Sequence, residues 1–255
     1  MSSPETKNRG ATGARPARWL SGTLVGAAML AACSNGDPEP APSEAAPPAQ
    51  PTQAAANTAP TNPTEARDAP VIVFLGDSLT AGFELSPKDA LPGQVASALA
   101  DLGVETNAVN AGVSGDTTAN GLARYDWSVA SADPDLLVVA LGANDYLLDL
   151  SPETTRANLA AILGRAKADG TPVVLAGITP RSDAALGSRD AAFGAIYPEL
   201  AAEYDVPLLP GLLAGVRDNP DLLLADGLHP TAEGVAIMAS NLATVIAPEL
   251  AALSE

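Results

Sequence analysis

The chain has 255 residues and carries 30 acidic against 13 basic side chains, a formal net charge of −17 at pH 7. A surface this acidic repels the phosphates of nucleic acids, so the charge argues against DNA or RNA as a partner. It favours a small-molecule substrate that is neutral, or whose anionic group stays away from the bulk of the protein surface.

The first 33 residues have the pattern of a secretory signal peptide. Four basic and one acidic side chain lie within residues 1–18, and an apolar stretch of 14 residues follows from Trp19 to Ala32. That stretch is too short to span a bilayer comfortably and has the length of a signal core. It leads into Leu30-Ala31-Ala32-Cys33, which resembles the bacterial lipoprotein signal, in which the cysteine is acylated.

Cys33 is the only cysteine of the chain, so no intramolecular disulfide can use it. We therefore expect lipid on Cys33 and an exported protein anchored in the cell envelope, with an unmodified thiol in an ordinary signal as the alternative. Ser34 resembles the signal that sorts lipoproteins to the outer membrane, so the expected location is the periplasmic face of that membrane. Removal of residues 1–32 would change the net charge from −17 to −20.

Residues 34–70 have the composition of a disordered tether. Of these 37 residues, 10 are Ala and 9 are Pro, and none is an aromatic or a branched aliphatic residue that could seed a core. A coil of this length would reach roughly 35 Å on average, and about 115 Å in extended polyproline geometry. We expect the tether to separate a folded domain, residues 71–252, from the membrane.

From Val71 onward, short apolar runs alternate with helical patterns. Strands are expected at 71–75, 104–109, 135–141, 172–178 and 206–209, and helices at 90–102, 152–169, 190–204 and 231–246. Ser151 is the expected N-cap of the second of these helices, and Gly170 its expected end. The alternation predicts a single α/β domain, a three-layer αβα sandwich with a central parallel sheet of about five strands.

Polar residues follow the predicted strands at the places where ligands bind in such folds, outside the carboxyl ends of the strands. The first strand is followed by Asp77 and Ser78, the second by 110–116 and the third by 142–145. The loop before the last helix contains Asp226 and His229. We therefore expect these four connections to bring their polar groups to one edge of the sheet.

His229 is the only histidine, which makes it the one imidazole available as a base near neutral pH. A serine hydroxyl becomes a good nucleophile when a base takes its proton, and Ser78 is the candidate hydroxyl. Asp226, three residues before His229, can hold the imidazole in the required tautomer. The alternative is that Asp226 and His229 merely cap the last helix.

Attack on an ester carbonyl places negative charge on oxygen, which hydrogen-bond donors must stabilise. Three candidate donors are the backbone N–H of Ser78, the backbone N–H of Gly115 and the side-chain amide of Asn144. Glycine suits such a place because its backbone can approach a ligand closely. Ordinary turn positions remain the alternative for both Gly115 and Asn144.

Together these motifs resemble the SGNH, or GDSL, hydrolase superfamily, and within it the bacterial thioesterase I, lysophospholipase and arylesterase group. The blocks that carry the resemblance are Gly76-Asp77-Ser78-Leu79, Gly115, Gly142-Ala143-Asn144-Asp145 and Asp226-Gly227-Leu228-His229-Pro230. Further strings support the narrower group: 110–117, Gly121-Leu122-Ala123-Arg124, Ala195-Ile196-Tyr197-Pro198 and 205–210. The likeness runs from about Val71 to Leu250.

The resemblance implies a flavodoxin-like SGNH fold, with Ser78 as nucleophile, His229 as base and Asp226 as its orienting partner. It also implies an oxyanion hole made by Ser78, Gly115 and Asn144. The expected activity is hydrolysis of small or medium acyl esters, aryl esters, thioesters or lysophospholipids through an acyl-enzyme, without cofactor or metal. A carbohydrate O-acetylesterase with the same triad and a non-catalytic ligand-binding lipoprotein are the alternatives, and the sequence leaves the oligomeric state open.

Several residues depart from the family pattern or allow two interpretations. Tyr146, Leu147 and Leu148 are bulkier than the resemblance leads us to expect, which predicts a reshaped acyl pocket, and Ala143 stands where close relatives have glycine. We expect Asp77, Asp116 and Asp145 to bind backbone amides and brace the site loops, with a divalent metal site as the alternative. The segment Thr179–Arg189 is either a mobile rim over the site or an ordinary surface loop.

Overall fold

The computed structural model describes residues 69–180 and 188–253. The signal peptide, Cys33 and all but the last two residues of the predicted tether lie outside them, as do residues 181–187 of the predicted rim. The described residues belong to one compact unit of the chain, Pro60–Glu255.

A parallel sheet with the strand order β2-β1-β3-β4-β5 forms the centre of this unit. Its strands are β1 (Val71–Gly76), β2 (Asn107–Gly112), β3 (Leu136–Ala140), β4 (Val173–Ala176) and β5 (Leu208–Leu209). The register places Gly76, the last residue of β1, beside Gly112 of β2 and Ala140 of β3. These three strands therefore end at one edge of the sheet, as the predicted site requires.

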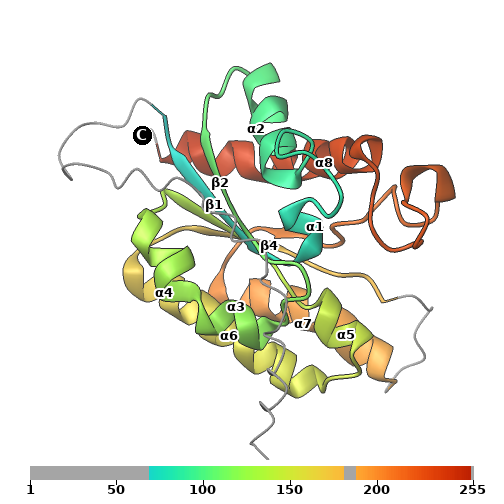
Figure 1. Ribbon diagram of the computed structural model, residues 1–255. Coiled ribbons are helices and arrows are strands. Elements are labelled where there is room, and N and C mark those ends of the chain that lie inside the picture. The colour runs from blue at the N-terminus through green and yellow to red at the C-terminus, as the bar shows by residue number, and fades with distance from the viewer. Residues whose placement is uncertain (1–68, 181–187, 254–255) are drawn as a thin grey trace, which may run out of the picture. The chain divides into compact units, whose positions relative to one another are not determined.

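Helices cover both faces of the sheet (Figure 1). The helices on one face are α2 (Leu91–Asp101) and α8 (Ala232–Ala252), and those on the other are α3 (Thr118–Ala123), α4 (Tyr125–Ser128), α6 (Pro152–Asp169) and α7 (Arg189–Tyr204). Short helices follow two of the strands, α1 (Ser78–Ala81) after β1 and α5 (Ala143–Leu147) after β3. Two 3₁₀ turns span Ala130–Ala132 and Pro220–Leu222.

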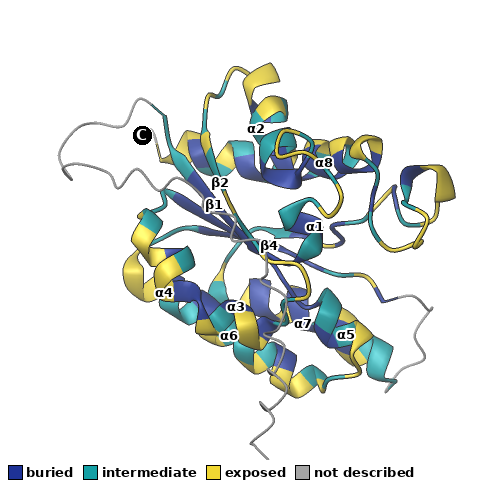
Figure 2. Ribbon diagram, in the orientation of Figure 1, coloured by how far each residue is buried: buried dark blue, intermediate teal, exposed yellow. Residues whose placement is uncertain are grey.

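The alternation of side chains along β1 divides the core into two clusters. Ile72 and Phe74 pack with α2 and α8, whereas Val73 and Leu75 pack with α6 and α7, and all four are buried (Figure 2). A strand buried on both faces explains the continuous apolar run of the sequence. The arrangement confirms the predicted three-layer α/β fold with a five-stranded parallel sheet.

Some predicted boundaries are wrong. β2 begins at Asn107 instead of residue 104, because the Val104 N–H bonds to the Leu99 carbonyl and so belongs to the turn that closes α2. The last helix continues through Pro248 to Ala252 instead of ending at residue 246. The short helices α1, α3, α4 and α5 were not among the predicted helices.

By length and composition, α8 could cross a membrane, but its apolar residues have another place in this structure. One side of the helix carries four apolar residues spaced about one turn from each other, Val235, Met238, Leu242 and Ile246. All four are fully buried in the core beside α2 and the sheet. We therefore describe α8 as a core helix of the α/β unit.

Candidate active site

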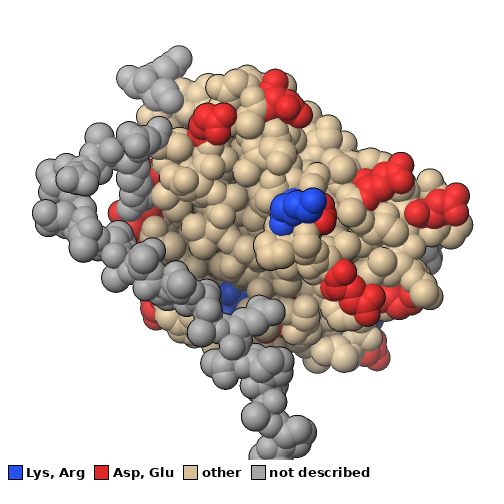
Figure 3. Space-filling view, turned by 45° about the horizontal axis from the view of Figure 1, so that its top comes forward, with Lys and Arg blue, Asp and Glu red and all other residues tan. Residues whose placement is uncertain are grey.

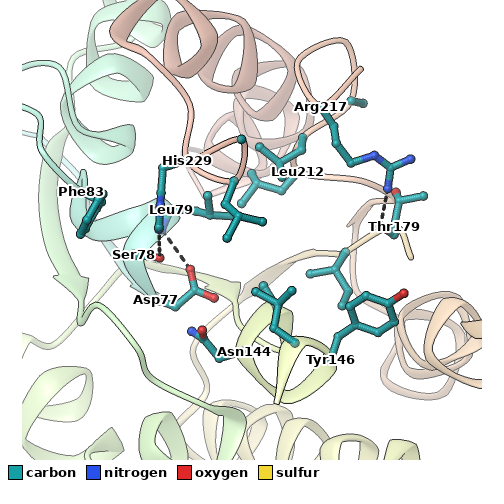
Figure 4. Close-up of a pocket in the computed structure, with 18 of the residues that line it drawn as sticks. Asp77, Ser78, Leu79, Phe83, Asn144, Tyr146, Thr179, Leu212, Arg217 and His229 are labelled. Atoms are coloured by element: carbon teal, nitrogen blue, oxygen red, sulfur yellow. Dashed lines mark hydrogen bonds between the residues drawn. The ribbon is translucent and has the colours of Figure 1, made fainter. Parts of the chain in front are cut away.

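The three predicted catalytic side chains lie in hydrogen-bonding contact. His229 Nε2 is 2.8 Å from Ser78 Oγ, although 151 residues separate the two in sequence (Figure 4). His229 Nδ1 is 2.6 Å from Asp226 Oδ2. An ionised carboxylate only accepts hydrogen bonds, so Nδ1 carries the proton, and Nε2 of the neutral ring is left to accept from the Ser78 hydroxyl. The geometry is that of a base poised to activate a serine.

Ser78 is placed by the end of β1. It is the first residue of α1, and the buried Asp77 caps that helix by accepting a hydrogen bond from the Leu79 N–H at 3.0 Å. Because β1 lies between β2 and β3, the hydroxyl projects at the edge where the three strands end.

A tight loop before α8 places Asp226 and His229. Asp226 Oδ1 accepts hydrogen bonds from the N–H groups of Leu228 and His229, at 2.8 and 3.0 Å. These donors, the His229 backbone first among them, lower the pKa of Asp226 to about 2, so its carboxylate stays ionised beside the imidazole. The N-cap of α8 is Thr231, which excludes the alternative that Asp226 and His229 cap this helix.

The predicted oxyanion donors line the same pocket as Ser78. Gly115 has a φ of +87°, and a side chain there would meet nothing within 4 Å, so its backbone is open to a ligand. Asn144 Nδ2 donates one hydrogen bond to the Asp116 carbonyl at 2.8 Å, which leaves its second proton for a substrate oxygen. The oxyanion role of Ser78, Gly115 and Asn144 stays a prediction that this arrangement permits.

Two of the three supporting aspartates, Asp77 and Asp145, bind backbone amides as we expected. Asp77 binds a backbone amide, as described above, and Asp145 is fully buried and accepts from the Thr118 N–H at 2.8 Å. Asp145 also accepts from the hydroxyls of Thr118 and Thr155, and so joins α5 to α3 and α6. Within the described residues, no three His, Cys, Asp or Glu side chains gather as a metal site requires.

Asp116 differs from the prediction, because its carboxylate pairs with Arg124 instead of with a backbone amide. The Arg124 Nε lies 2.6 Å from Asp116 Oδ2, and both side chains are largely buried. Arg124 Nη2 also donates to the Gly76 carbonyl at 2.9 Å, at the end of β1. No sequence pattern indicated this pairing, although Arg124 is the only basic residue between Lys88 and Arg156.

A pocket of about 520 Å³ opens beside the catalytic side chains (Figure 4). Most of its wall is apolar, and includes Leu79, Phe83, Leu147, Ile178, Leu212 and Leu213. Such a wall accommodates hydrocarbon better than a polar sugar.

The bulky residues after Asn144 shape this pocket only in part. Tyr146 and Leu147 line it, whereas Leu148 is 61% exposed and does not. Thr179 and Pro180, at the start of the predicted rim, are held by Arg217, whose Nη1 donates to both of their carbonyls. Whether residues 179–189 move as a rim stays a prediction.

Comparisons with known proteins agree with this site. Residues 74–237 match the model of the GDSL-like Lipase/Acylhydrolase family. The chain is 37% identical over 163 residues to an arylesterase of Vibrio mimicus, which covers 64% of this chain and 80% of that protein. It is also 37% identical over 181 residues to thioesterase 1/protease 1/lysophospholipase L1 of Escherichia coli K12, covering 71% and 85% of the two chains.

Among solved structures, the chain is similar to AlinE4, an SGNH-hydrolase family esterase. The identity is 39% and the TM-score is 0.60, with 72% of this chain and 98% of that chain covered.

The buried Asp77 carboxyl should make stability depend on pH. Burial raises the pKa of Asp77 to about 6, with the Leu79 N–H opposing, against 3.8 in a solvated chain. Between these values the folded state binds more protons than the unfolded state, so the free energy of unfolding falls as pH rises. Asp77→Asn removes this titration and keeps an acceptor for Leu79.

Relative to the parent chain, the Asp77→Asn variant should therefore gain up to about 3 kcal/mol of stability between pH 4 and pH 7. Urea unfolding across this range measures the difference. Asp226→Asn serves as the contrasting variant, because the pKa of Asp226 is lowered to about 2 in the folded state, so the stability that this carboxylate contributes is retained above its unfolded pKa of 3.8 and falls only as pH drops below it. A stability difference between the parent chain and the Asp77→Asn variant that does not change with pH would contradict the buried, protonated carboxyl.

The ion pair of Arg124 and Asp116 should be strongly coupled. Arg124→Met should lower the free energy of unfolding by about 3 kcal/mol, because it leaves a largely buried carboxylate unpaired. Adding Asp116→Asn should restore part of that loss, which a double-mutant cycle in urea detects. Arg156→Met in the exposed pair with Glu199 is the matched control and should cost less than about 1 kcal/mol. Additive losses at Arg124 and Asp116 would show that the two side chains act independently.

Proposed function

The chain belongs to the GDSL-like lipase/acylhydrolase family and is a carboxylic ester hydrolase, and from this premise we propose that it works through an acyl-enzyme formed on Ser78. His229 Nε2 takes the hydroxyl proton as Ser78 Oγ bonds to the substrate's carbonyl carbon. The resulting imidazolium then gives this proton to the leaving alcohol or thiol, whose bond to the carbonyl carbon breaks. Asp226 stabilises the charged ring throughout.

Hydrolysis of the acyl-enzyme repeats these steps with water. A water oxygen bonds to the acyl carbon while His229 takes one of its protons, and the proton then goes to Ser78 Oγ as the acyl–oxygen bond breaks. In both halves the negative oxygen would be stabilised by the N–H groups of Ser78 and Gly115 and by the free amide proton of Asn144.

One observation carries the proposal. Two hydrogen bonds in series, of 2.8 and 2.6 Å, join Ser78 Oγ to His229 and His229 to Asp226 at the wall of an apolar pocket. A serine with only a structural role would not need an ionised carboxylate bonded to the other ring nitrogen of its histidine partner. The donors Gly115 and Asn144 in the same pocket support the proposal further.

The substrates we propose are esters and thioesters with small or medium acyl groups, aryl esters, and lysophospholipids. The pocket has a volume of about 520 Å³ and a mostly apolar wall, which supports an acyl or aryl group in preference to an acetylated sugar. Acidic side chains dominate the charged positions on the face shown in Figure 3, which favours substrates without exposed negative charge. The similarity to an arylesterase and to a thioesterase supports both ester classes.

We also propose that the enzyme is exported and anchored through lipid on Cys33 at the periplasmic face of the outer membrane, with residues 34–70 as its tether. The sequence pattern before Cys33 supports export and lipidation, and Ser34 supports the outer-membrane location. Cys33→Ala should move esterase activity from the membrane fraction of cells to the soluble fraction. Activity that is soluble in the parent protein as well would exclude the anchor.

Replacing the nucleophile tests the catalytic proposal. Ser78→Ala should lower kcat on p-nitrophenyl esters by at least about 10³-fold, because no other group on the pathway can accept the acyl group. The unfolding transition in urea should be unchanged within about 1 kcal/mol. Ser97→Ala, the same replacement at an exposed serine of α2, should retain full activity.

A graded series of acyl lengths, with acetylated sugars included, then ranks the substrate classes. Retention of more than a few per cent of activity in the Ser78→Ala variant would contradict the acyl-enzyme mechanism. A preference for acetylated sugars over p-nitrophenyl esters would contradict the proposed substrate class.

A further inference from the structure

The face of the catalytic imidazole is covered by an aromatic ring that the sequence motifs do not include. Phe83 and His229 stack with their ring centroids 4.2 Å apart and their planes inclined by 25° (Figure 4). The ring of His229 is thus held at Nδ1 by Asp226, at Nε2 by Ser78 and on one face by Phe83.

The backbone of Phe83 is bonded to the nucleophile itself. The Ser78 carbonyl accepts hydrogen bonds from the N–H groups of Gly82, at 3.1 Å, and Phe83, at 3.2 Å. Gly82 ends α1 with a φ of +81°, where a side chain would collide with Ala90, and this turn directs residue 83 back toward the site. Each of the three residues Ser78, Phe83 and His229 therefore contacts the other two.

Phe83 is not needed to fill the core. Its side chain is 36% exposed and lies in the pocket wall, so its contact with His229 is the specific interaction that the structure assigns to it. An aromatic face also stabilises a cation placed over it, and the imidazole is cationic in the transition states of both half-reactions.

We infer that Phe83 is a positioning residue for His229, and that its contribution is greater in hydrolysis of the acyl-enzyme than in its formation. The inference rests on the proposed acyl-enzyme mechanism. Before acylation, Ser78 Oγ–H donates to Nε2 and fixes that edge of the ring. Once Oγ carries the acyl group it has no proton to donate, so Asp226 and Phe83 alone orient the imidazole that must activate water.

Rapid mixing with a p-nitrophenyl ester separates the two half-reactions, because the initial burst reports acylation and the steady phase reports deacylation. In the full chain, Phe83→Leu should slow the steady phase by about 3- to 10-fold and the burst by less than about 2-fold. In steady-state terms, kcat and KM should fall together and kcat/KM should change little. Phe83→Tyr, which keeps the aromatic face, should restore the steady phase.

Two control variants separate this effect from other causes. Leu147→Ala removes another apolar side chain of the pocket wall, and should change KM without the selective loss in the steady phase. Trp127→Leu removes an aromatic side chain that is 67% exposed on α4, and should leave both phases unchanged. Equal slowing of both phases in the Phe83→Leu variant, or a steady phase that stays slow in the Phe83→Tyr variant, would overturn the inference.

Nuclear magnetic resonance gives a readout that does not depend on turnover. With a single histidine in the chain, the ring C–H signals of His229 in the untagged protein are assigned at once. The ring current of Phe83 should shift them upfield, so they should move downfield in the Phe83→Leu variant and stay in place in the Phe83→Tyr variant. Unchanged signals after Phe83→Leu would refute the stack, whereas full turnover after Ser78→Ala would refute the proposed function instead.

Discussion

The hydrogen bond between His229 Nε2 and Ser78 Oγ is the contact on which the proposed chemistry depends. Its 2.8 Å length joins residues that are 151 positions apart, so it exists only when the first strand and the last loop are both in place. The sheet supplies one side, because β1 lies between β2 and β3 and ends level with both. The loop before α8 supplies the other, and its own backbone N–H groups keep Asp226 ionised at a pKa of about 2.

Around this contact, buried polar side chains hold the segments that follow β1, β2 and β3. Arg124 joins the Asp116 carboxylate to the end of β1, and the Asp116 carbonyl in turn accepts from the Asn144 amide. Asp145 joins α5 to α3 and α6 in the same way. Buried charges of this kind are costly unless fully paired, which makes the relative positions of Ser78, Gly115 and Asn144 a property of the whole network. Preorganised donors are what stabilisation of an oxyanion requires.

Local signals in the sequence were sufficient for much of the fold. α6 has the predicted bounds because Ser151 caps its start and Gly170, in the left-handed conformation, ends it. Two boundaries were predicted wrongly. β2 starts late because the Val104 N–H bonds to the Leu99 carbonyl. α8 continues past Pro248, although proline usually ends a helical pattern. The catalytic side chains could be named in advance because the chain has one histidine and Asp226 lies three residues before it.

The residues that the sequence did not reveal act through tertiary contacts. Phe83 belongs to no motif, and the string that ends at Arg124 assigns this residue no role, so their roles become visible only when His229 and Asp116 lie beside them. For the same reason, Asp116 was assigned a backbone partner when its carboxylate in fact pairs with an arginine.

Covalent labelling tests the activation of Ser78 by His229 most directly. A fluorophosphonate reacts quickly only with an activated hydroxyl, and peptide mapping by mass spectrometry identifies the modified residue. We expect a single adduct on Ser78, formed rapidly in the parent chain and at least about 10²-fold more slowly after His229→Gln. An adduct at another serine, or labelling of Ser78 at the same rate without the imidazole, would contradict this activation.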